Sequence, residues 1–213
     1  MTTPWKEQMA TIPVPGEDLV LEAVWQGGHR RGAVVAPPHP VYGGSLDHPV
    51  CNELAYGLWR AGWSSLRFNW RGVGASQGQV SGEPGPAERD YRAAVEQIVT
   101  TLGVPLLAAG YSFGAATALR VALGDVRVAG LLLVAPPVAM LESLPLEQLE
   151  VPVHVITGAN DEFAPLSELG DQLERLALNH LDVIPKVDHF FVSAGLAELS
   201  ELAREAGERF ADV

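Results

Sequence analysis

The sequence predicts a mostly parallel, doubly wound sheet of the α/β class. Short apolar runs typical of buried strands alternate along the chain with longer stretches of helical periodicity. The start of the chain differs, because residues 9–14 and 20–25 both resemble strands with no helix between them. Runs such as residues 33–36 and 128–134 are apolar throughout, which indicates a sheet covered by helices on both faces.

Each further element follows from a local pattern. Residues 50–61 place Leu54 and Leu58 on one helical face and end before Gly62. A polar, glycine-rich loop is expected to end at Pro86, where the next helix begins. We therefore expect strands at 9–14, 20–25, 33–36, 64–68, 105–109, 128–134, 151–158 and 181–184, and helices at 50–61, 87–102, 113–123, 166–176 and 196–210.

Length and composition favour one globular domain spanning residues 1–213. A chain of this length can bury a full core without disulfides or metals. Its 47% hydrophobic and 19% charged residues argue against disorder. Only residues 138–151 separate the strand after the central helix from the next one, which is too short for an inserted domain.

Charge and cysteine content exclude several classes of partner. The net charge of −12 opposes phosphate backbones and anionic membranes, so we expect no nucleic acid and no membrane partner. The one cysteine, Cys51, builds no internal disulfide, and no apolar run reaches the length of a membrane span. We expect a cytoplasmic protein. A homo-oligomer is compatible with the sequence, which locates no interface for one.

The central motif is Gly110-Tyr-Ser-Phe-Gly114, between an apolar run and a helix of small residues. A strand that turns into a helix within two residues holds its serine in a strained backbone conformation, and the flanking glycines let strand and helix approach. The hydroxyl of Ser112 is then exposed beside a helix amino terminus. The alternative is a glycine-bounded turn of no catalytic significance. The strand–turn–helix context predicts a nucleophile.

A serine nucleophile requires a base and a group that orients the base. His189 lies after the last strand and before the last helix, at the edge of the sheet where the serine turn emerges. Asp161 follows the strand that ends at Gly158, at the same edge. Asp188 is adjacent to His189 in sequence and would point away from it, and Glu162 is the local alternative to Asp161. The predicted triad is therefore Ser112, Asp161 and His189.

The tetrahedral oxyanion of acyl transfer requires two hydrogen-bond donors. One is the N–H of Phe113 at the start of the central helix. The second is expected from the loop at residues 37–45, with Val41 as the first choice and Tyr42 as the second. Pro40 has no N–H to donate.

These residues resemble the α/β-hydrolase superfamily, and in particular its small bacterial members without a cap domain. The resemblance rests on the segments 39–44 (HPVYGG), 68–78 (FNWRGVGASQG), 110–114 (GYSFG), 158–161 (GAND) and 188–189 (DH), and covers residues 12 to 210. It implies a serine hydrolase with the triad and the Val41 and Phe113 donors given above. It does not imply a substrate.

No cofactor or metal is expected from the sequence. Gly72-Val-Gly74 follows a strand like a dinucleotide-binding motif, but Gln77 occupies the third glycine position and no helix opens there. No two histidines have i,i+4 spacing, and one cysteine cannot form a thiolate site. His154 alternates within a strand and is interpreted as a packed core residue, and His180 as the start of a strand.

The sequence thus predicts a carboxylesterase that acts on small or short-chain acyl esters through an acyl-enzyme. Tyr42, Trp70, Phe113 and Phe190 are the candidates to line the substrate site. Thioesters and amides are alternative substrates, because the same residues serve every acyl transfer. A non-catalytic scaffold that binds a ligand or a protein is the alternative from another class.

Overall fold

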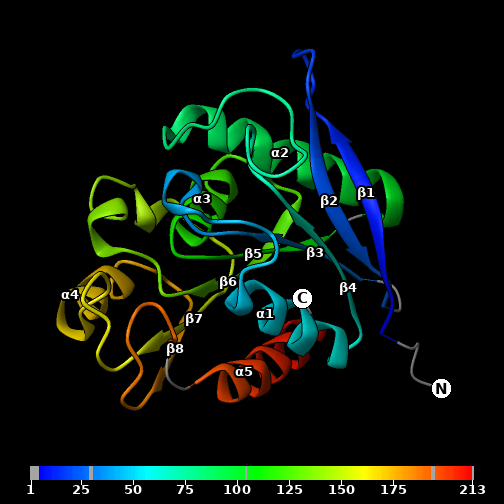
Figure 1. The fold of residues 1–213 in the computed structure, drawn as a ribbon. Helices are drawn as coiled ribbons and strands as arrows, with labels where there is room; N and C mark the ends of the chain where they lie inside the picture. Colours follow the sequence, from blue (N-terminus) through cyan, green and yellow to red (C-terminus); the bar gives the residue numbers. More distant parts are fainter. Residues whose placement is uncertain (1–4, 29–30, 104, 193–194, 213) are drawn as a thin grey trace.

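In a computed structural model of the chain, described for residues 5–28, 31–103, 105–192 and 195–212, the strands form one sheet in the order β1-β2-β4-β3-β5-β6-β7-β8 (Figure 1). The β1–β2 and β2–β4 pairs are antiparallel, and the other neighbours are parallel. The strands are β1 (Glu7–Pro13), β2 (Val20–Gln26), β3 (Arg31–Ala36), β4 (Trp63–Phe68), β5 (Leu106–Tyr111), β6 (Val128–Val134), β7 (Val153–Gly158) and β8 (Asn179–Ile184).

Helices cover both faces of this sheet, as expected for strands that are apolar throughout (Figure 1). On one face α1 and α5 lie side by side, and on the other lie α2, α3 and α4. The helices are α1 (Pro49–Arg60), α2 (Pro84–Leu102), α3 (Phe113–Ala122), α4 (Leu166–Leu173) and α5 (Leu196–Arg209), and single turns of 3-10 helix occupy Pro40–Tyr42, Val138–Met140, Leu146–Gln148 and Phe210–Asp212.

The core consists of two apolar layers separated by the sheet. Successive strand residues point to opposite faces, so Val34 belongs to the layer under α2 and α3, and Val35 to the layer under α1 and α5. Both side chains are fully buried. This alternation confirms the predicted doubly wound α/β architecture.

The predicted elements are all present, with small differences at their ends. The two largest are three residues each: α4 ends at Leu173 and not at residue 176, and α2 begins at Pro84 and not at residue 87. Proline is well suited to the first turn of a helix, where its missing N–H would have no partner. The described residues between β6 and β7 form only two single turns of 3-10 helix, in agreement with the predicted absence of a cap domain.

The parallel strands bring the sequence-predicted site residues to one edge of the sheet. β3, β5, β7 and β8 end at Ala36, Tyr111, Gly158 and Ile184, and the segments that follow them carry these residues. No helix in the described part of the chain is long and apolar enough to cross a membrane.

Candidate active site

Ser112 lies in the tight turn between β5 and α3, and its backbone has an unfavourable conformation. Its φ of 54° and ψ of −118° lie where a side chain is strained. A Cβ on Gly110 would lie 2.5 Å from the backbone of Gly114, and a Cβ on Gly114 would lie 2.4 Å from the carbonyl oxygen of Ala36. Both flanking glycines are therefore required by close backbone contacts.

The structure brings the three predicted triad residues into one hydrogen-bonded chain. The Ser112 Oγ lies 2.9 Å from the Nε2 of His189. The Nδ1 of His189 lies 2.9 Å and 3.0 Å from the two carboxylate oxygens of Asp161. All three residues are buried. The imidazole can thus accept a proton from the hydroxyl while the carboxylate fixes its orientation.

The carboxylate of Asp161 is held by the turn that follows β7. Its Oδ1 accepts 2.9 Å hydrogen bonds from the N–H groups of Phe163 and Ala164, and its Oδ2 accepts a 3.3 Å bond from Thr157. The two alternative acids are arranged differently. Asp188 accepts a hydrogen bond from the N–H of Phe190, and Glu162 is exposed.

The loop that carries His189 is fixed from two sides. The Tyr111 hydroxyl donates a 2.8 Å hydrogen bond to the carbonyl oxygen of His189. The Asn160 N–H donates a 2.9 Å bond to the carbonyl oxygen of Val187. A Cβ on Gly158 would lie 2.2 Å from that same oxygen, so the two loops meet only because residue 158 is glycine.

The two expected oxyanion donors differ in their surroundings. Phe113 opens α3, so its N–H has no acceptor one helical turn back. The N–H of Val41 donates to the Nδ1 of His39 at 3.3 Å, and the N–H of Tyr42 donates to the His39 carbonyl. The N–H of His39 itself has no acceptor among the described residues.

A cavity of about 590 Å³ opens beside Ser112. Its walls are mainly apolar or aromatic and include the predicted Tyr42, Phe113 and Phe190. The complete lining is Pro38, His39, Tyr42, Gly43, Gly44, His48, Tyr111, Ser112, Phe113, Pro137, Met140, Phe163, His189 and Phe190.

Trp70 does not line this cavity, which corrects the sequence-based expectation. Its side chain is 1% exposed and packs edge-on against Phe113, with ring centroids 5.5 Å apart. Its Nε1 donates to the carbonyl oxygens of Pro37 and Pro38 at 3.2 Å and 3.1 Å. Trp70 therefore supports the loop after β3 from behind. Val41 is likewise absent from the lining.

Sequence reasoning missed several cavity residues, among them His48, Met140 and Phe163. His48 caps α1, and its Nδ1 accepts from the N–H of Val50 at 3.3 Å. Burial lowers the pKa of His48, and the nearby His189 lowers it further. A histidine directly before Pro49 could have been recognised from the sequence as the cap of a helix. No local sequence pattern, however, indicates that this histidine lies beside Ser112.

Comparison with known proteins gives two matches at the level of sequence. A family model described as serine aminopeptidase, S33, matches residues 44–146. An uncharacterised protein of Rickettsia prowazekii is 29% identical over 170 residues, covering 75% of this chain and 71% of that one.

Two solved structures extend the similarity over almost the whole chain. An α/β serine hydrolase homologue from Coxiella burnetii is 29% identical, with a TM-score of 0.84, and covers 93% of this chain and 96% of that one. A serine hydrolase without a lid from Xanthomonas campestris is 27% identical, with a TM-score of 0.82, and covers 99% and 97%. The chain therefore has the fold of the α/β serine hydrolases that it resembles, and the residues that the structure describes include no cap domain.

Proposed function

We propose that the protein is a serine carboxylesterase for small or short-chain acyl esters. The observation that carries this proposal is the hydrogen-bonded chain from the Ser112 Oγ through His189 to Asp161, at the wall of an accessible cavity. A scaffold that only bound a ligand would require none of these contacts, nor the strained serine backbone.

The reaction proceeds in two half-cycles. In the first, His189 Nε2 takes the proton of Ser112 as Oγ attacks the ester carbonyl. The resulting oxyanion collapses, the C–O bond to the alcohol breaks, and His189 gives its proton to the departing alkoxide. In the second, water loses a proton to His189 and attacks the acyl-serine. Collapse of that intermediate releases the acid and returns the proton to Ser112. Asp161 stabilises the imidazolium in both halves.

For the oxyanion we propose the N–H groups of Phe113 and His39. The N–H of Val41, which the sequence favoured, is the alternative, but its hydrogen bond to the His39 imidazole would have to break first. The His39 N–H can bind the oxyanion without breaking a hydrogen bond, because no described residue accepts from it. His39 also lines the cavity, whereas Val41 does not.

Cavity size and chemistry support the substrate class. A volume of about 590 Å³ accommodates a small molecule, and Phe163 and Phe190 stand half-exposed at its rim. Apolar walls favour an uncharged acyl or alkoxy group over a charged one. Without a cap domain, nothing in the described chain encloses a long acyl chain.

The test is hydrolysis of p-nitrophenyl esters from acetate to decanoate. We expect an optimum at short chains and a loss on the order of 10⁶ in turnover for Ser112→Ala. The matched control is Ser167→Ala, an exposed serine of α4, which should keep full activity. Hydrolysis of aminoacyl amides or thioesters in place of esters would reassign the substrate class. Activity that survives Ser112→Ala would refute the mechanism.

We also propose that the protein is cytoplasmic and that its partner is a small-molecule substrate. Cys51 is a buried free thiol, and burial raises its pKa to about 12. The net charge of −12 disfavours nucleic acids. Cell fractionation should recover the protein in the cytosolic fraction, and recovery outside the cell would contradict this assignment.

A further inference from the structure

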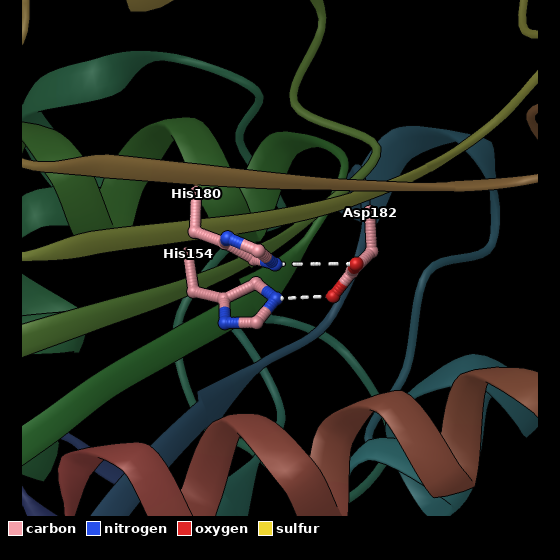
Figure 2. Close-up of side chains that lie close together, drawn as sticks. All are labelled: His154, His180 and Asp182. Atoms are coloured by element: carbon pink, nitrogen blue, oxygen red, sulfur yellow. Dashed lines mark hydrogen bonds and ion pairs between the residues drawn. The ribbon is translucent and has the colours of Figure 1, made fainter.

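Outside the active site, two histidines and one aspartate meet on neighbouring strands. His154 of β7 and His180 of β8 are partners in the parallel ladder, and Asp182 lies two residues further along β8. Residues two apart on a strand share a face, so all three side chains project from the same side of the sheet. Figure 2 shows them converging above α5, with both imidazole rings directed at the carboxylate.

The distances within this cluster are short. The Nε2 of His154 lies 2.7 Å from the Oδ2 of Asp182, and the Nε2 of His180 lies 3.2 Å from its Oδ1. One ligand-type atom from each residue lies within 4.8 Å of the other two. Ligands about 2.0–2.2 Å from a tetrahedral ion are separated by roughly 3.3–3.6 Å. The three ligand-type atoms therefore lie close to the spacing of a tetrahedral site, and a bound ion would replace the two hydrogen bonds to the carboxylate.

We propose that His154, His180 and Asp182 form a binding site for a divalent transition-metal ion, of which Zn²⁺ is the best match. Two imidazoles and one carboxylate suit zinc and its first-row neighbours, whereas magnesium and calcium prefer oxygen ligands alone. Three protein ligands leave one position of a tetrahedron for water. His180, whose side chain is 47% exposed, gives that position access to solvent.

The local environment supports this assignment. The side chain of His154 is 3% exposed, and burial lowers its pKa to about 4, so the ring is neutral and able to coordinate at neutral pH. The positive charge of Arg209, at the end of α5, acts on His154 and opposes a cation. The carboxylate of Asp182 offsets it at shorter range.

The site is separate from the serine chemistry. His154 lies near the start of β7, four residues before Gly158, and strand geometry places it about 13 Å from the end of the strand that leads to Asp161. β8 is the edge strand of the sheet, where one row of backbone groups has no neighbouring strand. An ion bound by His154 of β7 and by two residues of β8 would stabilise the pairing of the edge strand β8 with β7.

The experiment is calorimetric titration of the metal-free protein with Zn²⁺, combined with thermal unfolding. The wild type should bind one equivalent at this site. At a free Zn²⁺ concentration 100 times Kd, its melting temperature should rise by about 5–10 °C. His180→Ala and Asp182→Asn should each weaken binding at least 100-fold, since loss of even an outer partner costs 10–100-fold. Asp171→Asn, an exposed acid of α4, is the matched control and should bind like the wild type.

Co²⁺ gives a second measurement that reports coordination directly. Tetrahedral Co²⁺ on nitrogen and oxygen ligands absorbs visible light, and this band should appear with the wild type and with Asp171→Asn and be lost in His180→Ala. His180 is half-exposed, so its replacement should leave the circular dichroism spectrum unchanged. Failure of the wild type to bind either ion would overturn the proposal. The proposal would also be overturned if His180→Ala and Asp182→Asn bound the ion as tightly as the wild type does. The ion would then lie elsewhere, for example on the histidines that line the cavity.

Discussion

The hydroxyl of Tyr111 donates a 2.8 Å hydrogen bond to the backbone carbonyl of His189. Tyr111 directly precedes Ser112, so this bond ties the segment that carries the nucleophile to the segment that carries the base. The two residues are 78 positions apart in the chain, and the bond between them is buried. Their rings also lie close, with centroids 5.7 Å apart. The relative position of serine and imidazole is thus fixed by a direct contact as well as by the sheet.

Replacing Tyr111 by phenylalanine removes this bond and keeps the ring. We expect kcat for ester hydrolysis to fall about tenfold with little change in KM, because a hydrogen bond of this kind contributes roughly 1 kcal/mol and its loss loosens His189. Tyr91→Phe is the matched control, since the Tyr91 hydroxyl donates to the carbonyl of Ala109 and neither residue lines the cavity. That variant should lose comparable stability and keep its kcat. Equal kcat values for the two variants would exclude a positioning role for Tyr111.

The second oxyanion donor can be removed by proline, which has no N–H. His39 has φ of −60°, the value proline adopts, so His39→Pro should fold. We expect kcat to fall 10²–10³-fold relative to His39→Ala, which removes the imidazole and keeps the N–H. Val41→Pro should reduce kcat far less. A large loss confined to Val41→Pro would instead assign the donor to Val41, as the sequence suggested.

The close contact at Gly114 should make this position intolerant of a side chain. A Cβ there would meet the carbonyl oxygens of Ala36 and Pro37 at 2.4 Å and 2.5 Å, and backbone atoms cannot move aside cheaply. We expect Gly114→Ala to lower the free energy of unfolding by about 1–3 kcal/mol. Gly170→Ala, in α4 with nothing within 4 Å of its Cβ position, should raise it by about 0.5–1 kcal/mol. Urea unfolding measures both, and equal effects would contradict the crowding at Gly114.

Much of the fold and of the site was predictable because both follow from chain order. Parallel strands present their carboxyl ends at one edge, so a serine after β5, an acid after β7 and a histidine after β8 had to emerge near one another. The contacts among Ser112, Asp161 and His189 agree with that expectation. The α/β class and the missing cap domain followed from the alternation of elements and the short segment between β6 and β7.

Other features depended on packing that no local pattern reveals. Trp70 follows a strand like the site residues, yet its ring turns inward because its Nε1 finds the carbonyls of Pro37 and Pro38. The hydrogen bond from the Val41 N–H to the His39 imidazole depends on the rotamer of His39. His154 and His180 meet through the register of β7 and β8, so a search for helical histidine spacing could not find them.

The most direct test of the central claim is covalent labelling with a fluorophosphonate, followed by mass spectrometry of the peptides. We expect a single phosphonylated residue, Ser112, with one label per protein chain. Labelling should slow by orders of magnitude in His189→Ala, because the hydroxyl then has no base. Denaturing the protein first should abolish labelling. A native protein that remains unlabelled, or that is labelled at another residue, would contradict the assignment of Ser112 as the nucleophile.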